Sequence, residues 1–172
     1  MKKRIYEIAV FGLLGAVMFI SEILMGFLPN VHLLGTLTIP YTVVYRRKAL
    51  YPIYIYVLLN GIYAGFSSWW VPYLYLWTIL WAITMLLPCN MSPKIAIVVY
   101  MLVCALHGLA FGTLYAPFQA LMFGLTWKGM IAWIVAGLPF DAVHAVGNLC
   151  AGVLILPIIT ALRSADKNIS RQ

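Results

Sequence analysis

Apolar residues form long runs in this chain, and short polar or charged segments separate the runs. A helix needs about 20 residues to cross the hydrocarbon core of a bilayer. By this measure the runs predict six spanning helices, at residues 5–27, 31–45, 49–65, about 70–87, 94–112 and about 139–162. The second is short, so we expect neighbouring helices or a thinned bilayer to accommodate it. The pattern predicts an all-α integral membrane protein, with a single transmembrane domain over residues 1–172.

Residues 113–138 are apolar too, but Pro117 and three glycines interrupt them. They form either a seventh span or a hairpin that enters the outer face of the membrane. With six spans and a cytoplasmic N-terminus, every Lys and Arg except Lys128 falls on the cytoplasmic side, whereas seven spans would place the C-terminal cations outside. We therefore expect six transmembrane helices, cytoplasmic N- and C-termini, and an outer re-entrant or interfacial segment before the last helix. Pro139 is expected in the first turn of that helix.

The composition excludes several classes of protein. Of 172 residues, 65% are hydrophobic and only 9% are charged, which is unlike a soluble domain. The net charge of +7 does not indicate a nucleic-acid partner, because the cations lie in short gaps between apolar runs. Metal-binding Cys/His spacings, HExxH, GxSxG and phosphate-binding loops are absent. We expect no metal site, no cofactor and no catalytic residues, so a transporter of this sequence would need an ion gradient or a separate ATPase.

Ionisable residues within the predicted spans are candidates for function, because charge is costly in a bilayer. Asp141, His144 and Asn148 are spaced i, i+3 and i+7 and share one face of a helix. A helix-dipole acid, a local hydrogen bond and a bond between helices are the structural alternatives for these three. For Glu22 the alternative is a structural ion pair, and for His107 it is a buried core histidine.

Aromatic residues concentrate around the predicted outer loop between the third and fourth spans. Trp69, Trp70, Tyr73 and Trp77 are its most prominent members. They form either an interfacial aromatic belt or a stacking wall for a flat ligand.

Small residues form a stripe on the first predicted span. Ala9, Gly12 and Ala16 are spaced three and four apart, which lets another helix approach closely. The stripe serves either internal packing or docking of a separate membrane subunit.

In this order, these features resemble the substrate-binding S components of energy-coupling factor (ECF) vitamin transporters. The resemblance rests on chain size, six spans, the outer aromatic loop and the small-residue stripe. Two further motifs add to it: Leu28-Pro29-Asn30 before the second span, and Pro139-Phe140-Asp141, which is similar to the opening of the last span in several members.

The resemblance implies a transport subunit of the bacterial plasma membrane, not an enzyme. Such a protein binds a vitamin-like micronutrient from outside, docks on a transmembrane coupling protein carrying two cytoplasmic ATPases, and topples to release the ligand inside. By position, Ala9, Gly12 and Ala16 would form the docking stripe. The resemblance places the pocket among the outer halves of the last three spans and the loops above them. The candidates for substrate binding are Glu22, Asn60, Trp69, Trp70, Tyr73, Trp77, His107, Gln119, Asp141, His144 and Asn148.

The same residues indicate a class of ligand. Many rings favour a flat heteroaromatic molecule. Two carboxylates, Glu22 and Asp141, and few outer cations favour a neutral or cationic one. The alternatives are an intramembrane enzyme that uses Asp141 and His144, and a non-catalytic membrane scaffold.

Overall fold

The structure, a computed structural model, describes residues 2–88 and 90–169, with side chains for residues 5–88 and 90–167. Helices make up almost all of this part of the chain, and it contains no strand. The helices are α1 (Lys2–Met25), α2 (Leu34–Tyr45), η1 (Arg46–Ala49), α3 (Leu50–Ala64), α4 (Tyr73–Leu86), α5 (Pro93–Leu109), α6 (Phe111–Phe123), α7 (Trp127–Ala151), η2 (Gly152–Leu154) and α8 (Ile155–Ile169). The expectation of an all-α protein is confirmed.

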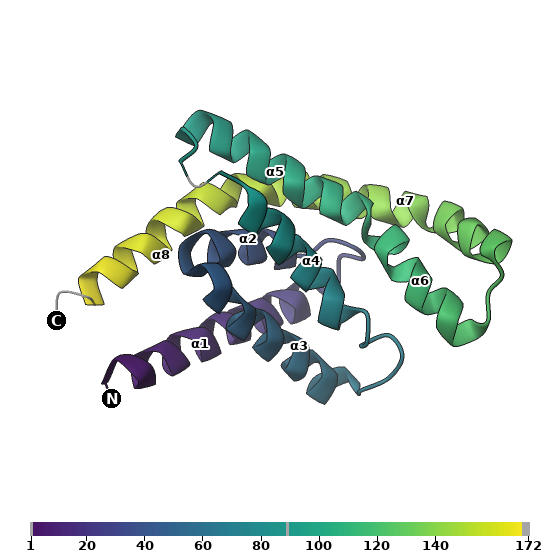
Figure 1. Cartoon of the computed structure of the whole chain (residues 1–172), viewed down its shortest axis with the longest axis horizontal. Helices are drawn as coiled ribbons and strands as arrows, with labels where there is room; N and C mark the ends of the chain where they lie inside the picture. The colour runs from purple at the N-terminus through teal and green to yellow at the C-terminus, as the bar shows by residue number, and fades with distance from the viewer. Residues whose placement is uncertain (1, 89, 170–172) are drawn as a thin grey trace.

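Two helix pairs form the sides of the molecule, and α2 lies between them. α1 packs against α3, while α5 packs along α7 (Figure 1). Residues 34–42 of α2 are all buried, and α2 contacts α4 and α8 as well as both pairs. Its Leu37 and Tyr41 belong to one apolar cluster and its Ile39 to another, so α2 connects the two halves of the core.

Three helical stretches are long and apolar enough to cross a membrane: Ile5–Met25, Pro93–Phe123 and Trp127–Lys167. Tyr73–Leu86 is a shorter apolar helix. At 1.5 Å per residue, α2 is only about 18 Å long and α3 about 22 Å, against a hydrocarbon core of about 30 Å. The structure therefore supports a membrane protein, and the count of six spans stays a prediction.

The last helix does not begin at Pro139, and that expectation is wrong. Gly124 adopts a left-handed conformation (φ 65°) and ends α6. The Thr126 side chain then accepts a hydrogen bond from the Gly129 backbone N–H at 3.2 Å and caps α7, which begins at Trp127, twelve residues before the proline. Residues 113–138 thus form most of α6 and the first half of α7, and Pro139 lies inside a helix, as membrane helices tolerate.

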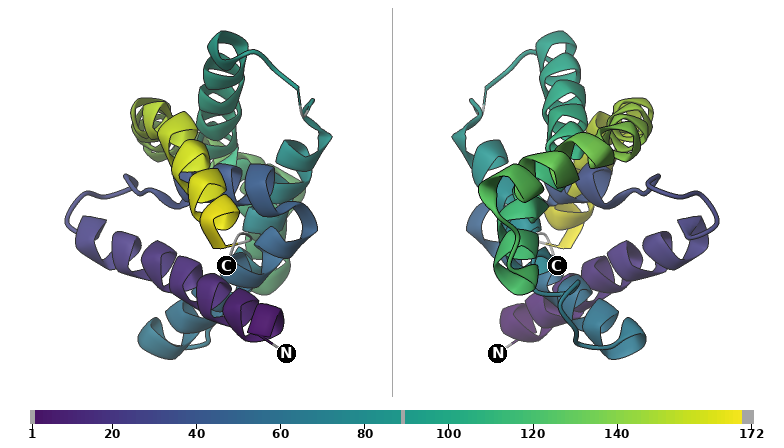
Figure 2. Two further views of the ribbon diagram at one scale, coloured as in Figure 1. Left: turned by 90° about the vertical axis from the view of Figure 1, so that its left-hand side faces the viewer. Right: turned by 90° about the vertical axis from the view of Figure 1, so that its right-hand side faces the viewer.

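The cationic segments gather at one end of the molecule. Both chain ends, η1 and the start of α5 lie on the left of Figure 1, and the left view of Figure 2 faces this end. Lys48 on η1 forms an ion pair with Glu7 on α1, with Nζ and Oε1 2.7 Å apart. Arg46, Lys94 and Arg163 belong to segments at the same end.

We predict that Gly15→Leu destabilises the protein through the contact between α1 and α3. A Cβ atom at Gly15 would lie 2.6 Å from Ile55 Cγ2 and 3.0 Å from the Pro52 carbonyl oxygen. Overpacking of this kind costs about 1–3 kcal/mol, and thermal unfolding in detergent will measure it. Gly12→Leu is the matched control, because a Cβ there meets nothing within 4 Å. An equal loss in both variants would contradict this packing.

Candidate functional site

A cavity of about 230 Å³ lies where α1, α4, α6 and α7 meet the connection between α1 and α2. Most of segment 25–32 forms one wall, and Glu22, Tyr73, Phe111 and His144 project from the four helices. Pro29 and the left-handed Asn30 (φ 60°) shape this wall. No Lys or Arg is among the described residues that line it. The cavity is therefore an aromatic site with one carboxylate.

The carboxylate is held in place from α3. Asn60 Nδ2 donates a hydrogen bond to Glu22 Oε2 at 2.7 Å, and its contact with the Tyr56 hydroxyl oxygen is 3.3 Å. Both Asn60 and Tyr56 are buried. Since the amide neutralises no charge, Glu22 keeps its capacity to attract a cation or a hydrogen-bond donor.

Beneath the cavity lies a layer of rings centred on Trp77. This fully buried side chain contacts His32 and His107 with ring centroids 5.7 Å apart, and it contacts Tyr73 and Phe111 at 6.0 Å. The contacts with His32 and Tyr73 have steep angles between the ring planes, 75° and 84°, which the quadrupoles of aromatic rings favour. The layer gives the cavity a rigid aromatic floor.

Several buried polar atoms in this layer have no hydrogen-bond partner among the described residues. They are His32 Nδ1, Trp77 Nε1, His107 Nδ1 and His144 Nε2. The rings of His32 and His144 are 4.3 Å apart at 78°. His107 Nε2 donates to the Leu76 carbonyl at 3.0 Å, which leaves its Nδ1 as an acceptor. Buried polar atoms are normally paired, so these four atoms leave hydrogen-bonding capacity unused, and two of them belong to His32 and His144, which line the cavity.

The polar face of α7 exists as expected, but only one of its members reaches the cavity. Asp141, His144 and Asn148 are all buried. Both carboxylate oxygens of Asp141 accept from the Gly112 backbone N–H, at 3.1 and 3.2 Å, in the first turn of α6. Asn148 Nδ2 donates to the Cys104 carbonyl at 3.1 Å and joins α7 to α5. His144 alone lines the cavity.

Trp69 and Trp70, from the predicted outer loop, pack around the connection between α3 and α4. Trp70 Nε1 donates to the Val57 carbonyl at 2.8 Å, and the Trp69 ring lies 5.5 Å from Tyr73. Neither tryptophan lines the cavity, and Gln119 on α6 does not line it either. Of the sequence candidates, Glu22, Tyr73 and His144 line the cavity, while Asn60, Trp77 and His107 support it.

His32, Tyr56 and Phe111 belong to the site but were not among the sequence candidates, and neither were the other residues of the wall formed by segment 25–32. The sequence does contain a pattern that could have identified His32. This residue follows the Pro29-Asn30 turn between two apolar runs, so its polar ring lies just before a buried helix. Tyr56 and Phe111 lie in apolar runs and resemble ordinary core residues, so only their neighbours in space reveal them.

Comparisons with protein-family models, curated proteins and solved structures give no match. The chemistry of the site must be argued from its own geometry. Among the described residues, no group of three or more His, Cys, Asp or Glu side chains is placed to hold a metal ion. One carboxylate, several rings and unpaired imidazole nitrogens suit a small planar molecule that is neutral or cationic and has polar edges.

We predict that Asp141→Ala lowers stability, because Gly112 at the start of α6 loses its acceptor. The loss of a buried acceptor costs about 1–3 kcal/mol. Asp141→Asn keeps one acceptor oxygen and should lose less. Thermal unfolding of the three purified proteins tests this order, and an alanine variant as stable as wild type would refute the capping role.

Proposed function

We propose that this chain is the high-affinity, membrane-embedded substrate-binding S component of an ECF-type importer of the bacterial plasma membrane. It captures a vitamin-like micronutrient from outside and delivers it inward after docking on a coupling protein with two ATPases. The observation that carries the proposal is the aromatic cavity around Glu22 and His144. The order of the sequence features that resemble the family supports it.

The position of the cavity favours capture from outside. About 22 Å of helix separates Glu7, at the cationic end of α1, from Glu22. Cationic segments of membrane proteins lie on the cytoplasmic side. With that orientation, the ion pair of Glu7 and Lys48 lies inside and the cavity faces outward, as an importer needs.

The lining of the cavity narrows the substrate class. Tyr73 and Phe111 present aromatic surface, and Glu22 supplies negative charge without a Lys or Arg in the described lining. Stacking and cation–π attraction favour a flat heteroaromatic molecule that is neutral or positively charged. A phosphorylated substrate would meet the Glu22 carboxylate with no cation to balance it.

The packing of α1 leaves its small-residue stripe available for docking. Gly15 is pressed against Pro52 and Ile55 of α3, whereas a Cβ at Gly12 meets open space. Ala9 is exposed and lies on the same side of α1 as Gly12. Gly12 and Gly15 are three residues apart, so the proposed docking stripe lies next to the contact with α3, while Gly12 itself takes no part in that contact.

No observation favours the alternative functions over this one. In the enzyme hypothesis Asp141 and His144 act together, but Asp141 binds the Gly112 N–H on α6 while His144 lines the cavity. A scaffold has no need for unpaired polar atoms beside a cavity. A turnover assay on the released ligand would test the enzyme hypothesis.

We predict that Glu22→Gln loses the bound micronutrient. Mass spectrometry of small molecules released from the detergent-purified protein will identify a compound that wild type retains. Loss of a charged hydrogen bond weakens affinity about tenfold or more. Glu7→Gln is the matched control, since it makes the same change at the other end of α1. A compound that Glu22→Gln and wild type hold equally would remove this cavity as the site.

We predict that Gly12→Leu abolishes docking and spares ligand binding. The leucine side chain blocks close approach of a partner helix to α1, while its Cβ meets no described residue within 4 Å. Co-purification with the coupling protein and its ATPases measures docking. Unchanged co-purification would show that the partner docks elsewhere.

A further inference from the structure

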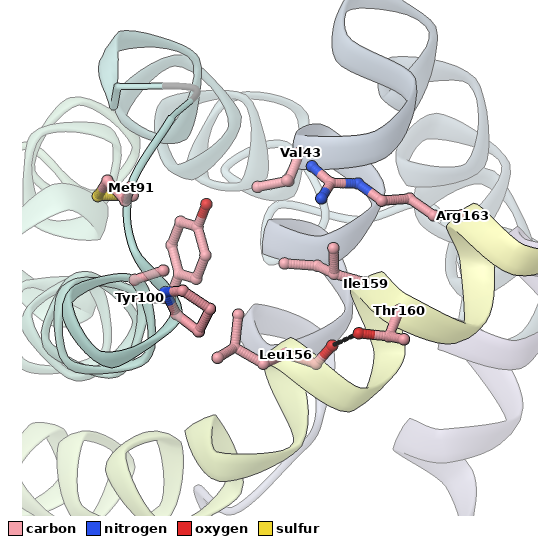
Figure 3. A pocket seen from close by; sticks show the side chains of 9 residues that line it. Val43, Met91, Tyr100, Leu156, Ile159, Thr160 and Arg163 are labelled. Carbon is pink, nitrogen blue, oxygen red and sulfur yellow. Dashed lines mark hydrogen bonds between the residues drawn. The ribbon is translucent and has the colours of Figure 1, made fainter.

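A second hollow of about 180 Å³ lies at the cationic end, between α2, α5 and α8. Its floor is apolar and consists mainly of Val43, Ala96, Leu156 and Ile159. Figure 3 shows the side chains of Val43, Leu156 and Ile159 facing that of Tyr100 across the hollow. The hollow is separate from the cavity around Glu22, with which it shares no lining residue.

Arginine side chains border this floor. A smaller hollow of about 30 Å³ shares Val43, Tyr100 and Arg163 with the first one and adds Arg46. In Figure 3, the Arg163 side chain extends from α8 towards Val43, and the Tyr100 hydroxyl points towards the same part of the hollow. Arg46 Nη2 donates to the Met85 carbonyl at 3.1 Å, which holds this arginine in position. The two hollows form one crevice with an apolar floor and a cationic rim.

The charge of the rim determines which ligand fits. No Asp or Glu is among the described residues that line either hollow. A guanidinium pairs with phosphate in a planar, two-pronged geometry. Basic pockets between helices on the cytoplasmic side of membrane proteins suit acidic lipid head groups. An anionic lipid matches both parts of the crevice, because it carries a phosphate next to acyl chains.

We propose that this crevice binds an anionic glycerophospholipid, with its phosphate at Arg163 and Arg46 and an acyl chain along Val43, Ala96 and Ile159. The lipid bridges α5 and α8 and stabilises the cytoplasmic end of the protein. This binding site is independent of the substrate cavity and of any partner subunit.

Native mass spectrometry of the full chain in detergent tests the site, with added phosphatidylglycerol or phosphatidylcholine. We expect wild type to retain phosphatidylglycerol in preference to phosphatidylcholine. One basic residue near a membrane surface is worth about fivefold in affinity, so Arg163→Gln should reduce retention by about that factor. Arg163 is exposed, so the change should not disturb folding. Lys167→Gln is the matched control, because it removes an exposed charge from the same helix without touching the crevice.

A second variant tests the apolar floor. Ala96→Leu fills part of the hollow without changing charge, and it should reduce phosphatidylglycerol retention and remove the rise in melting temperature that this lipid causes in wild type. Inorganic phosphate at millimolar concentration should not displace the lipid. Equal losses in Arg163→Gln and Lys167→Gln would indicate diffuse attraction and overturn the site. Wild-type retention in Arg163→Gln or Ala96→Leu, or displacement by inorganic phosphate, would also overturn it.

Discussion

Burial of a short helix on all sides organises this protein. Residues 34–42 of α2 have no exposed face, so α1, α4, α5 and α8 must surround them. Close approach is possible because Gly35 lacks a side chain: a Cβ there would lie 2.7 Å from Cys104 Sγ on α5. The helix is too short to span a bilayer alone and depends on its neighbours for an apolar environment.

The cavity around Glu22 follows from this arrangement. Since α2 is buried and short, the chain must travel from the end of α1 to the start of α2 through a connection that stays against the protein. That connection forms one wall of the cavity and brings His32 to within 4.3 Å of the His144 ring. The Trp77 ring contacts His32 in this connection, and it also contacts Tyr56 of α3, His107 of α5 and Phe111 of α6. The core and the site therefore share the same aromatic residues.

The two ends of the molecule differ in charge, and each end therefore suits a different proposed ligand. The end with the cavity carries Glu22 and aromatic side chains, with no described Lys or Arg in the cavity lining. The other end carries Arg46, Lys48 and Arg163 beside an apolar crevice. A ligand with positive or neutral character suits the first end, and an anionic lipid suits the second. Between these two ends, one face of α1 carries Ala9 and Gly12. A Cβ atom at Gly12 would meet no described residue within 4 Å.

The sequence by itself determined the helical class, the presence of helices long and apolar enough to cross a membrane, and most helix boundaries, because long apolar runs between polar gaps have few other solutions in a bilayer. It also showed that Asp141, His144 and Asn148 share a helix face, since that depends only on helical spacing. Tertiary structure alone decided that Asp141 caps α6 and Asn148 joins α5, while His144 meets His32 and Glu22 at a cavity. Pro139 lies inside α7 because the cap at Thr126 starts the helix earlier, which apolar periodicity does not reveal. The sequence could not show these side-chain partners because they are distant along the chain. Gly112 is 29 residues from Asp141 and Cys104 is 44 residues from Asn148, so only packing of the helices brings them together.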